Sequence, residues 1–131
     1  MADVPPCVYC GGQPVLRPTS DHVYRKDYGP VWECPRCLAR CGVHRGTNKP
    51  LGTVANAEDR LLRETAHGLF DPLWRRKMVS AGIQKSHARS RAYRWLASEM
   101  GMEPARCHIS MMHGDDLRRV IATCLKYARS T

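Results

Sequence analysis

The chain has 131 residues, of which 43% are hydrophobic and 25% are charged. This composition is ordinary for a globular domain and excludes a chain that is disordered throughout. No stretch approaches the roughly 18 consecutive apolar residues of a membrane span, and the first residues lack the pattern of a secretory signal. The formal net charge of +9 favours polyanionic partners, with nucleic acid first among them. We therefore expect a cytoplasmic protein without membrane contact.

The composition changes near residue 55. Residues 1–55 contain five of the seven cysteines, most of the prolines and short β-like stretches, whereas residues 56–131 have helical patterns. The first part carries seven basic and four acidic residues, and the second carries fourteen and eight. We therefore expect an N-terminal domain over 1–55, followed by a helical part over 56–131 that packs on or beside it and carries most of the positive charge.

Two Cys-x-x-Cys segments, here called knuckles, dominate the first part. They place Cys7 with Cys10 and Cys34 with Cys37, separated by 23 residues. Seven cysteines are an odd number, and clustered cysteines in a reducing compartment usually bind metal instead of forming disulfides. Paired thiolates at this spacing are typical of a tetrahedral zinc site. The sequence therefore predicts one structural Zn²⁺ ion on these four cysteines, with a closed shell that leaves no position for catalysis.

Cys41 and His44 provide an alternative ligand set. Together with Cys34 and Cys37 they could supply four ligands, but that set would leave Cys7 and Cys10 without a role. We favour a Cys41 that packs inward as a small hydrophobic residue on the strand after the second knuckle. The membership of Cys41 or His44 in the site stays open from the sequence alone.

Short strands are expected around the knuckles. Residues 14–16, 22–24 and 31–33 have strand-like patterns, and residues 27–30 form a turn. Two knuckles that hold one ion at the end of a small antiparallel sheet make a zinc ribbon. With the helices that follow, the fold class is α+β: a zinc ribbon and then three to four helices.

The helices are predicted from their caps and apolar faces. Asn56 precedes the first helix, and Asp71 with the following proline begins a second one. A further helix runs from the cap Ser86 to a glycine at residue 101, and Asp115 opens the last helix. Each has apolar residues at helical spacing, so we expect the helices to pack against one another.

A basic stretch without acidic residues lies between residues 72 and 98. A solvated helix face is an equally good interpretation of such a stretch, and Trp74 and Trp95 are more typical of a core than of base stacking. As a nucleic-acid-binding surface, the stretch would use Arg75, Arg76, Lys77, Lys85, Arg89, Arg91 and Arg94.

Two further sites are weakly indicated. Cys107, His108 and His113 lack a fourth ligand for a second metal site. The order of the knuckles with His22 between them is similar to zinc-stapled HNH nucleases, but Asn48 follows the second knuckle and thus lies in the wrong place. We therefore favour a protein that is not an enzyme.

Seven segments carry a resemblance to a known family: residues 7–11, 31–37, 42–47, 50–56, 66–74, 92–97 and 107–112. In these segments the chain resembles a family of zinc-finger-containing domains of unknown function that occurs in phages, prophages and bacteria. The resemblance implies zinc at the four knuckle cysteines and a place in phage or mobile-element biology, and it supplies no reaction. Cys41 departs from the family pattern.

Three functions follow in order of preference. The first is a zinc-binding module that contacts DNA or RNA through the basic stretch. The second is a protein-interaction or inhibitor module that targets an acidic host protein, and the third is an HNH-like nuclease. Binding to nucleic acid that weakens steeply with salt distinguishes the first function from the others.

Overall fold

The computed structural model describes residues 4–130, and the chain divides into two compact units between Glu58 and Asp59. The first, here called the ribbon unit, contains three strands, and the second, the helical unit, contains three α-helices. This order of a small sheet and then helices confirms the predicted α+β fold. No helix in the described part of the chain is both long and apolar enough to cross a lipid bilayer.

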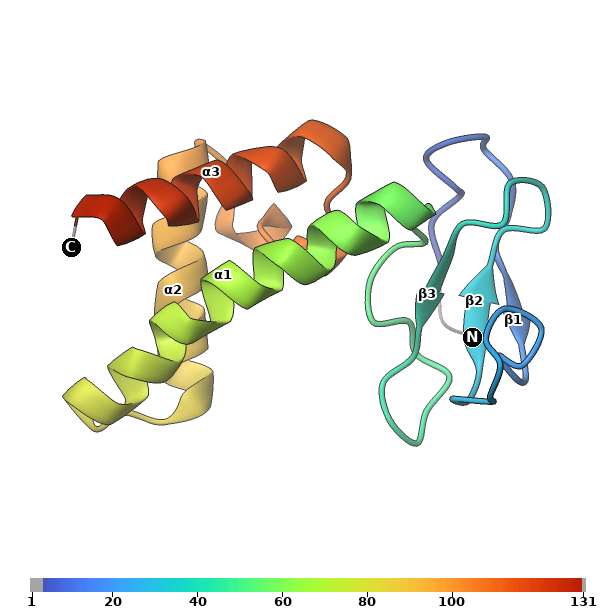
Figure 1. Ribbon diagram of the computed structural model, residues 1–131, viewed down its shortest axis with the longest axis horizontal. Helices are drawn as coiled ribbons and strands as arrows, with labels where there is room; N and C mark the ends of the chain where they lie inside the picture. Colours follow the sequence, from blue (N-terminus) through green and yellow to red (C-terminus); the bar gives the residue numbers. More distant parts are fainter. Residues whose placement is uncertain (1–3, 131) are drawn as a thin grey trace. The chain divides into compact units, whose positions relative to one another are not determined.

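The ribbon unit is built on one three-stranded antiparallel sheet. Its strands are β1 (Val15–Arg17), β2 (Val31–Glu33) and β3 (Arg40–Gly42), with β2 in the middle. Trp32 of β2 pairs with Leu16 of β1 and with Cys41 of β3 (Figure 1). A small core forms on this sheet from Cys7, Cys34, Ala39, Cys41 and Val54. Cys7 and Cys34 thus belong to the core that the sheet supports, Cys10 packs against it, and Cys37 is exposed.

The predicted strand over residues 22–24 is wrong, because this segment lies in a loop of turns. Side chains within the loop supply its hydrogen bonds. The Asp27 carboxylate accepts from the backbone N–H of Ser20 at 3.0 Å and from that of Gly29 at 2.8 Å. The Ser20 hydroxyl in turn accepts from the N–H of Tyr28 at 2.7 Å. Such local bonds offer the backbone an alternative to strand pairing, and they also lower the pKa of Asp27.

The helical unit contains α1 (Ala57–Ala81), α2 (Lys85–Met100) and α3 (Gly114–Ser130). Two short 3₁₀ segments, η1 (Pro104–Arg106) and η2 (Ile109–Met111), connect α2 to α3. In Figure 1, α2 crosses both α1 and α3. The largest fully buried side chains of the unit are those of Phe70, Leu96, Ile109 and Leu117. This core shares no buried residue with the core of the ribbon unit.

A single helix replaces the two that the sequence predicts around residue 71. α1 continues through Pro72 to Ala81. A proline inside a helix costs about 3 kcal/mol because it removes one backbone hydrogen bond and clashes with the preceding turn. Phe70 and Trp74 lie on either side of Pro72 and are both buried in the same core. Burial contributes about 1.5–3 kcal/mol for each large apolar side chain, which offsets the cost of the proline.

Helix ends in this unit are set by contacts that the sequence predicts only in part. Gly101 ends α2 in the left-handed conformation at φ 66°, as expected. Ser86 is not the N-cap of α2, because the helix begins at Lys85 after Gln84. At α3 the carboxylate of Asp59 accepts from the N–H of Gly114 at 2.9 Å. A buried acid near the start of α1 therefore caps a helix that begins 55 residues later.

Candidate metal centre and basic surface

The first knuckle folds into a turn that holds both of its sulfurs on one side. The N–H of Gly11 donates to the carbonyl of Cys7 at 2.8 Å, and the N–H of Cys7 donates to the carbonyl of Gly12 at 2.8 Å. Gly11 takes the left-handed conformation at φ 75°, which glycine adopts without strain. At Gly12 an added Cβ would lie only 3.0 Å from the sulfur of Cys34. Gly11 therefore serves the turn of the first knuckle, and Gly12 serves the close approach of the two knuckles.

The second knuckle repeats this turn bond for bond. The N–H of Leu38 donates to the carbonyl of Cys34 at 2.9 Å, and the N–H of Cys34 donates to the carbonyl of Ala39 at 2.8 Å. Leu38 occupies the position that corresponds to Gly11 and has the same left-handed conformation, with φ 67°. It is the one residue other than glycine with a positive φ among residues 4–130. The second knuckle thus has the same geometry as the first, with a strained residue in place of a glycine.

The two turns bring four sulfurs together. The Sγ atoms of Cys7, Cys10, Cys34 and Cys37 all lie within 4.8 Å of one another, and the pairs Cys7–Cys37 and Cys10–Cys34 are each 3.4 Å apart. A tetrahedron of sulfurs at 2.3 Å from a central zinc has edges of about 3.8 Å. The observed separations bracket this value. The four cysteines are therefore positioned to bind one metal ion.

Backbone amides around the second knuckle favour the metal-binding form of one of these thiols. The N–H of Cys37, and after it that of Arg36, donates to the Cys34 sulfur and lowers its pKa to about 6. At Cys37 the N–H of Ala39 also lowers the pKa, but burial and the neighbouring thiols outweigh it and raise the pKa to about 12. Without metal, the thiolate form is thus more favourable at Cys34 than at Cys37.

A family model for a zinc-finger-containing domain matches residues 3–127. The chain belongs to this family. The match spans both units, so the helices are as much a part of the zinc-finger-containing domain as the ribbon. Neither the curated proteins nor the solved structures contain a match to the chain. The four-cysteine cluster and the family together make this domain a zinc-binding module.

The alternative ligands of this zinc-finger-containing domain lie outside the cluster. Cys41 is buried in the ribbon core, and its sulfur lies 3.6 Å from the carbonyl oxygen of Gly52. His44 is exposed at the start of a turn, where its N–H donates to the carbonyl of Lys49 at 2.9 Å. Among residues 4–130, the knuckle cysteines are the one group of possible ligands close enough to share an ion.

The histidines that suggested a second metal or a nuclease have structural neighbours. His113 lies 3.1 Å from the guanidinium of Arg63, and the ring of His108 packs against Tyr93. His22 pairs with the buried carboxylate of Glu33 at 3.3 Å, which also accepts from Arg17 at 3.2 Å. His67 lies 3.7 Å from Asp71, one turn away on α1.

The cations of the basic stretch lie on the two helices α1 and α2. All seven side chains are exposed, and none pairs with a carboxylate in the part of the chain that the structure describes. Arg75 and Lys85 lie over the ring of Trp74 at 5.1 and 5.6 Å, and Arg89 lies over the ring of Tyr93. We call the following set the basic surface: Arg75, Arg76, Lys77, Lys85, Arg89, Arg91 and Arg94.

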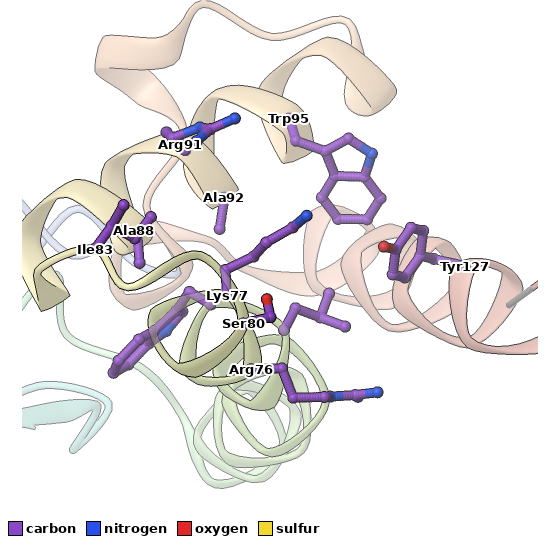
Figure 2. Close-up of a pocket in the computed structure, with 11 residues that line it drawn as sticks. Arg76, Lys77, Ser80, Ile83, Ala88, Arg91, Ala92, Trp95 and Tyr127 are labelled. Carbon is purple, nitrogen blue, oxygen red and sulfur yellow. The ribbon is translucent and has the colours of Figure 1, made fainter.

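The tryptophans of the helical unit have different surroundings. Trp74 is buried in the core, and its indole N–H donates to the Asp71 carboxylate at 2.9 Å. Trp95 is partly buried and makes an edge contact with Tyr127 of α3, with the ring centroids 5.1 Å apart. Figure 2 shows Trp95 and Tyr127 side by side at a pocket that also receives side chains of the basic surface. Tyr127 lies 32 residues beyond Trp95, and nothing in the sequence singled it out.

Proposed function

We propose that this zinc-finger-containing chain is a zinc-stabilised module that binds nucleic acid through its helical unit. The observation that carries the proposal is the basic surface, which consists of seven exposed cations without a carboxylate partner among the described residues. Paired cations are partly neutralised by their own protein, whereas these remain available to phosphates. Binding through them releases counterions from the nucleic acid, which supplies most of the affinity at low salt.

In this proposal the metal is Zn²⁺, and its role is structural. Four thiolates from Cys7, Cys10, Cys34 and Cys37 would complete its shell, so no position remains for a substrate. The strands of the ribbon unit have three residues each, and a sheet of this size rarely folds alone. In such sites the free energy of metal binding is also free energy of folding. We expect one zinc per chain by elemental analysis, and loss of ribbon folding in Cys34→Ser.

The proposal for the basic surface is tested by a salt titration. A fluorescent single-stranded oligonucleotide is titrated with protein at salt concentrations from 50 to 200 mM. Five phosphate contacts on a single strand would give a slope of log K against log salt of about −3.5, a loss of about 100-fold in affinity over this range. The triple variant Arg75→Ala, Arg76→Ala, Lys77→Ala should reduce the slope by about 2.

A matched variant separates this surface from net charge. Arg25→Ala, Lys26→Ala, Arg45→Ala removes three exposed cations from the ribbon unit and changes the net charge by the same amount. We expect it to bind nearly as well as the unmodified protein. Equal losses in the two triple variants would contradict the proposal, because binding would then follow total charge. Absence of binding to DNA and RNA at 50 mM salt would favour an acidic protein partner instead.

A further inference from the structure

A pocket of about 340 Å³ opens between the three helices of the helical unit. Arg76 and Lys77 reach it from α1, Arg91 and Trp95 from α2, and Tyr127 from α3 (Figure 2). Its volume lies at the lower end of the range of about 300–1,000 Å³ that is usual for small-molecule sites. The pocket is thus large enough for one planar ring system and small for a folded peptide.

The charges around this pocket have one sign. Three of its lining residues are the exposed cations Arg76, Lys77 and Arg91, and no aspartate or glutamate lines it. They come from two helices, Arg76 and Lys77 from α1 and Arg91 from α2, so they do not follow one helix face (Figure 2). The pocket therefore favours a ligand that carries more than one negative charge on the part that remains outside the pocket.

The inner wall is aromatic and apolar. Trp95 is partly exposed, and Tyr127 is 38% exposed although both adjoin the core. Trp74 contributes a buried ring whose N–H is already bonded to Asp71, and Arg75 and Lys85 lie over this ring. Aromatic rings in such a wall stack well on flat unsaturated groups. The ligand inside the pocket is therefore flat and apolar on its faces.

We infer that the pocket receives one unstacked base of a single-stranded nucleic acid, with the flanking phosphates on Arg76, Lys77 and Arg91. A nucleotide joins a flat aromatic base, which fits the aromatic wall, to an anionic phosphate, which fits the cations that line the pocket. The basic surface continues beyond the pocket through Arg75 and Lys85 over Trp74, which suits a chain of phosphates. A base inside a duplex is stacked and paired, so the pocket selects single strands. The inference rests on the nucleic-acid binding proposed above.

The test compares a strand with bases, a strand that has the same number of phosphates but no bases, and a duplex. A labelled ten-residue oligothymidylate, a ten-residue abasic strand and a blunt duplex are titrated at one salt concentration. The strand with bases should bind between about five- and 150-fold more tightly than the abasic strand, the range that stacking of one base supplies. The duplex should not gain this factor. The fluorescence of Trp95 should be quenched by the thymidylate, and Trp95→Phe should lose that quenching.

A substitution that fills the pocket keeps its charge unchanged. Ala92 lines the pocket from α2, so Ala92→Phe should lower thymidylate affinity to that of the abasic strand and leave abasic binding unaltered. Ala122→Phe, at an exposed position of α3 that does not line the pocket, is the matched control and should bind as the unmodified protein does. If Ala92→Phe does not fold, Tyr127→Ala removes one wall at an exposed position and should reduce the preference for bases.

The outcomes separate the pocket from the surface. Equal, salt-sensitive affinity for the thymidylate and abasic strands would overturn the inference and leave the nucleic-acid proposal standing. No affinity for any strand would overturn both. Displacement of the thymidylate by a ten-residue polyglutamate of similar charge, at similar concentration, would overturn the inference in favour of an acidic peptide.

Discussion

Leu38 offers a direct measure of the strain in the zinc ribbon. It holds φ at 67° in the second knuckle, where the first knuckle has Gly11 at 75°. An L-residue in this conformation costs about 1–2 kcal/mol relative to its preferred regions. The Leu38 side chain is 59% exposed, so little packing is lost when it is removed. Glycine loses more chain entropy on folding, which costs about 0.5–1 kcal/mol and offsets part of the relieved strain. Leu38→Gly should therefore stabilise the ribbon by about 0.5–1 kcal/mol.

The effect should be measured as zinc affinity. Because metal binding and ribbon folding are one equilibrium, the gain should tighten zinc binding by about two- to fivefold in competition with a chromophoric chelator at fixed pH. The inverse change, Gly11→Ala, should weaken binding by a similar factor. An added Cβ at Gly11 meets no atom within 4 Å, so its effect comes from the backbone alone. Leu38→Ala is the control, since it removes the side chain and keeps the strain. A gain in Leu38→Ala equal to that in Leu38→Gly would refute the reasoning.

Two further predictions concern the caps and the thiols of the helical unit. Asp59→Ala should destabilise the unit by about 1 kcal/mol in urea unfolding, because the N–H of Gly114 loses its acceptor. Asp59→Asn should lose less stability, and equal losses of stability in the two variants would contradict a capping role. Chelation of the metal should make five thiols react rapidly with a thiol reagent, the four knuckle cysteines and Cys41. Cys107 and Cys124 should stay protected in the core of the helical unit, where burial raises the pKa of both thiols. The pKa of Cys124 is raised to about 11, so labelling of Cys124 should increase as the pH approaches 11. Rapid reaction of all seven would show that the helices need the metal.

The metal cluster was predictable because its information is local. Each knuckle is a four-residue turn, and the turn geometry follows from its own backbone hydrogen bonds. Two strands were predictable for the same reason: those expected over 14–16 and 31–33 lie at Val15–Arg17 and Val31–Glu33. Cys41 was the open question, and its place on β3 follows from the pairing of that strand with Trp32. Pairing across a sheet depends on a separate segment of the chain, whereas the turn of a knuckle depends on neighbouring residues.

Two errors show where local patterns fail. Residues 22–24 have the composition of a strand, but Ser20 and Asp27 bind the backbone on both sides and close a loop instead. Pro72 carries a strong signal for a helix start, but the shared core of Phe70 and Trp74 outweighs it. In each case the contacts that decide the structure are made in the folded chain and cannot be predicted from the pattern of a single segment.

The pocket could not have been found from the basic stretch alone. All seven cations were predicted as a run of charge, and they lie on two helices, α1 and α2. Tyr127 belongs to α3 and completes the aromatic wall only because α3 packs beside Trp95. A charge run therefore predicts a surface, and the concave part of that surface depends on tertiary packing.

Four acids of the helical unit have partners within that unit other than the cations of the basic surface. Asp59 is used by the N-terminus of α3, and Asp71 accepts from Trp74. Asp115 and Asp116, in the first turn of α3, pair with arginines one turn later at 3.1 and 3.8 Å. Carboxylates at a helix N-terminus interact favourably with the positive end of the helix dipole as well as with nearby cations. These acids are thus committed within the fold, and the cations of residues 75–94 keep their full charge for a partner.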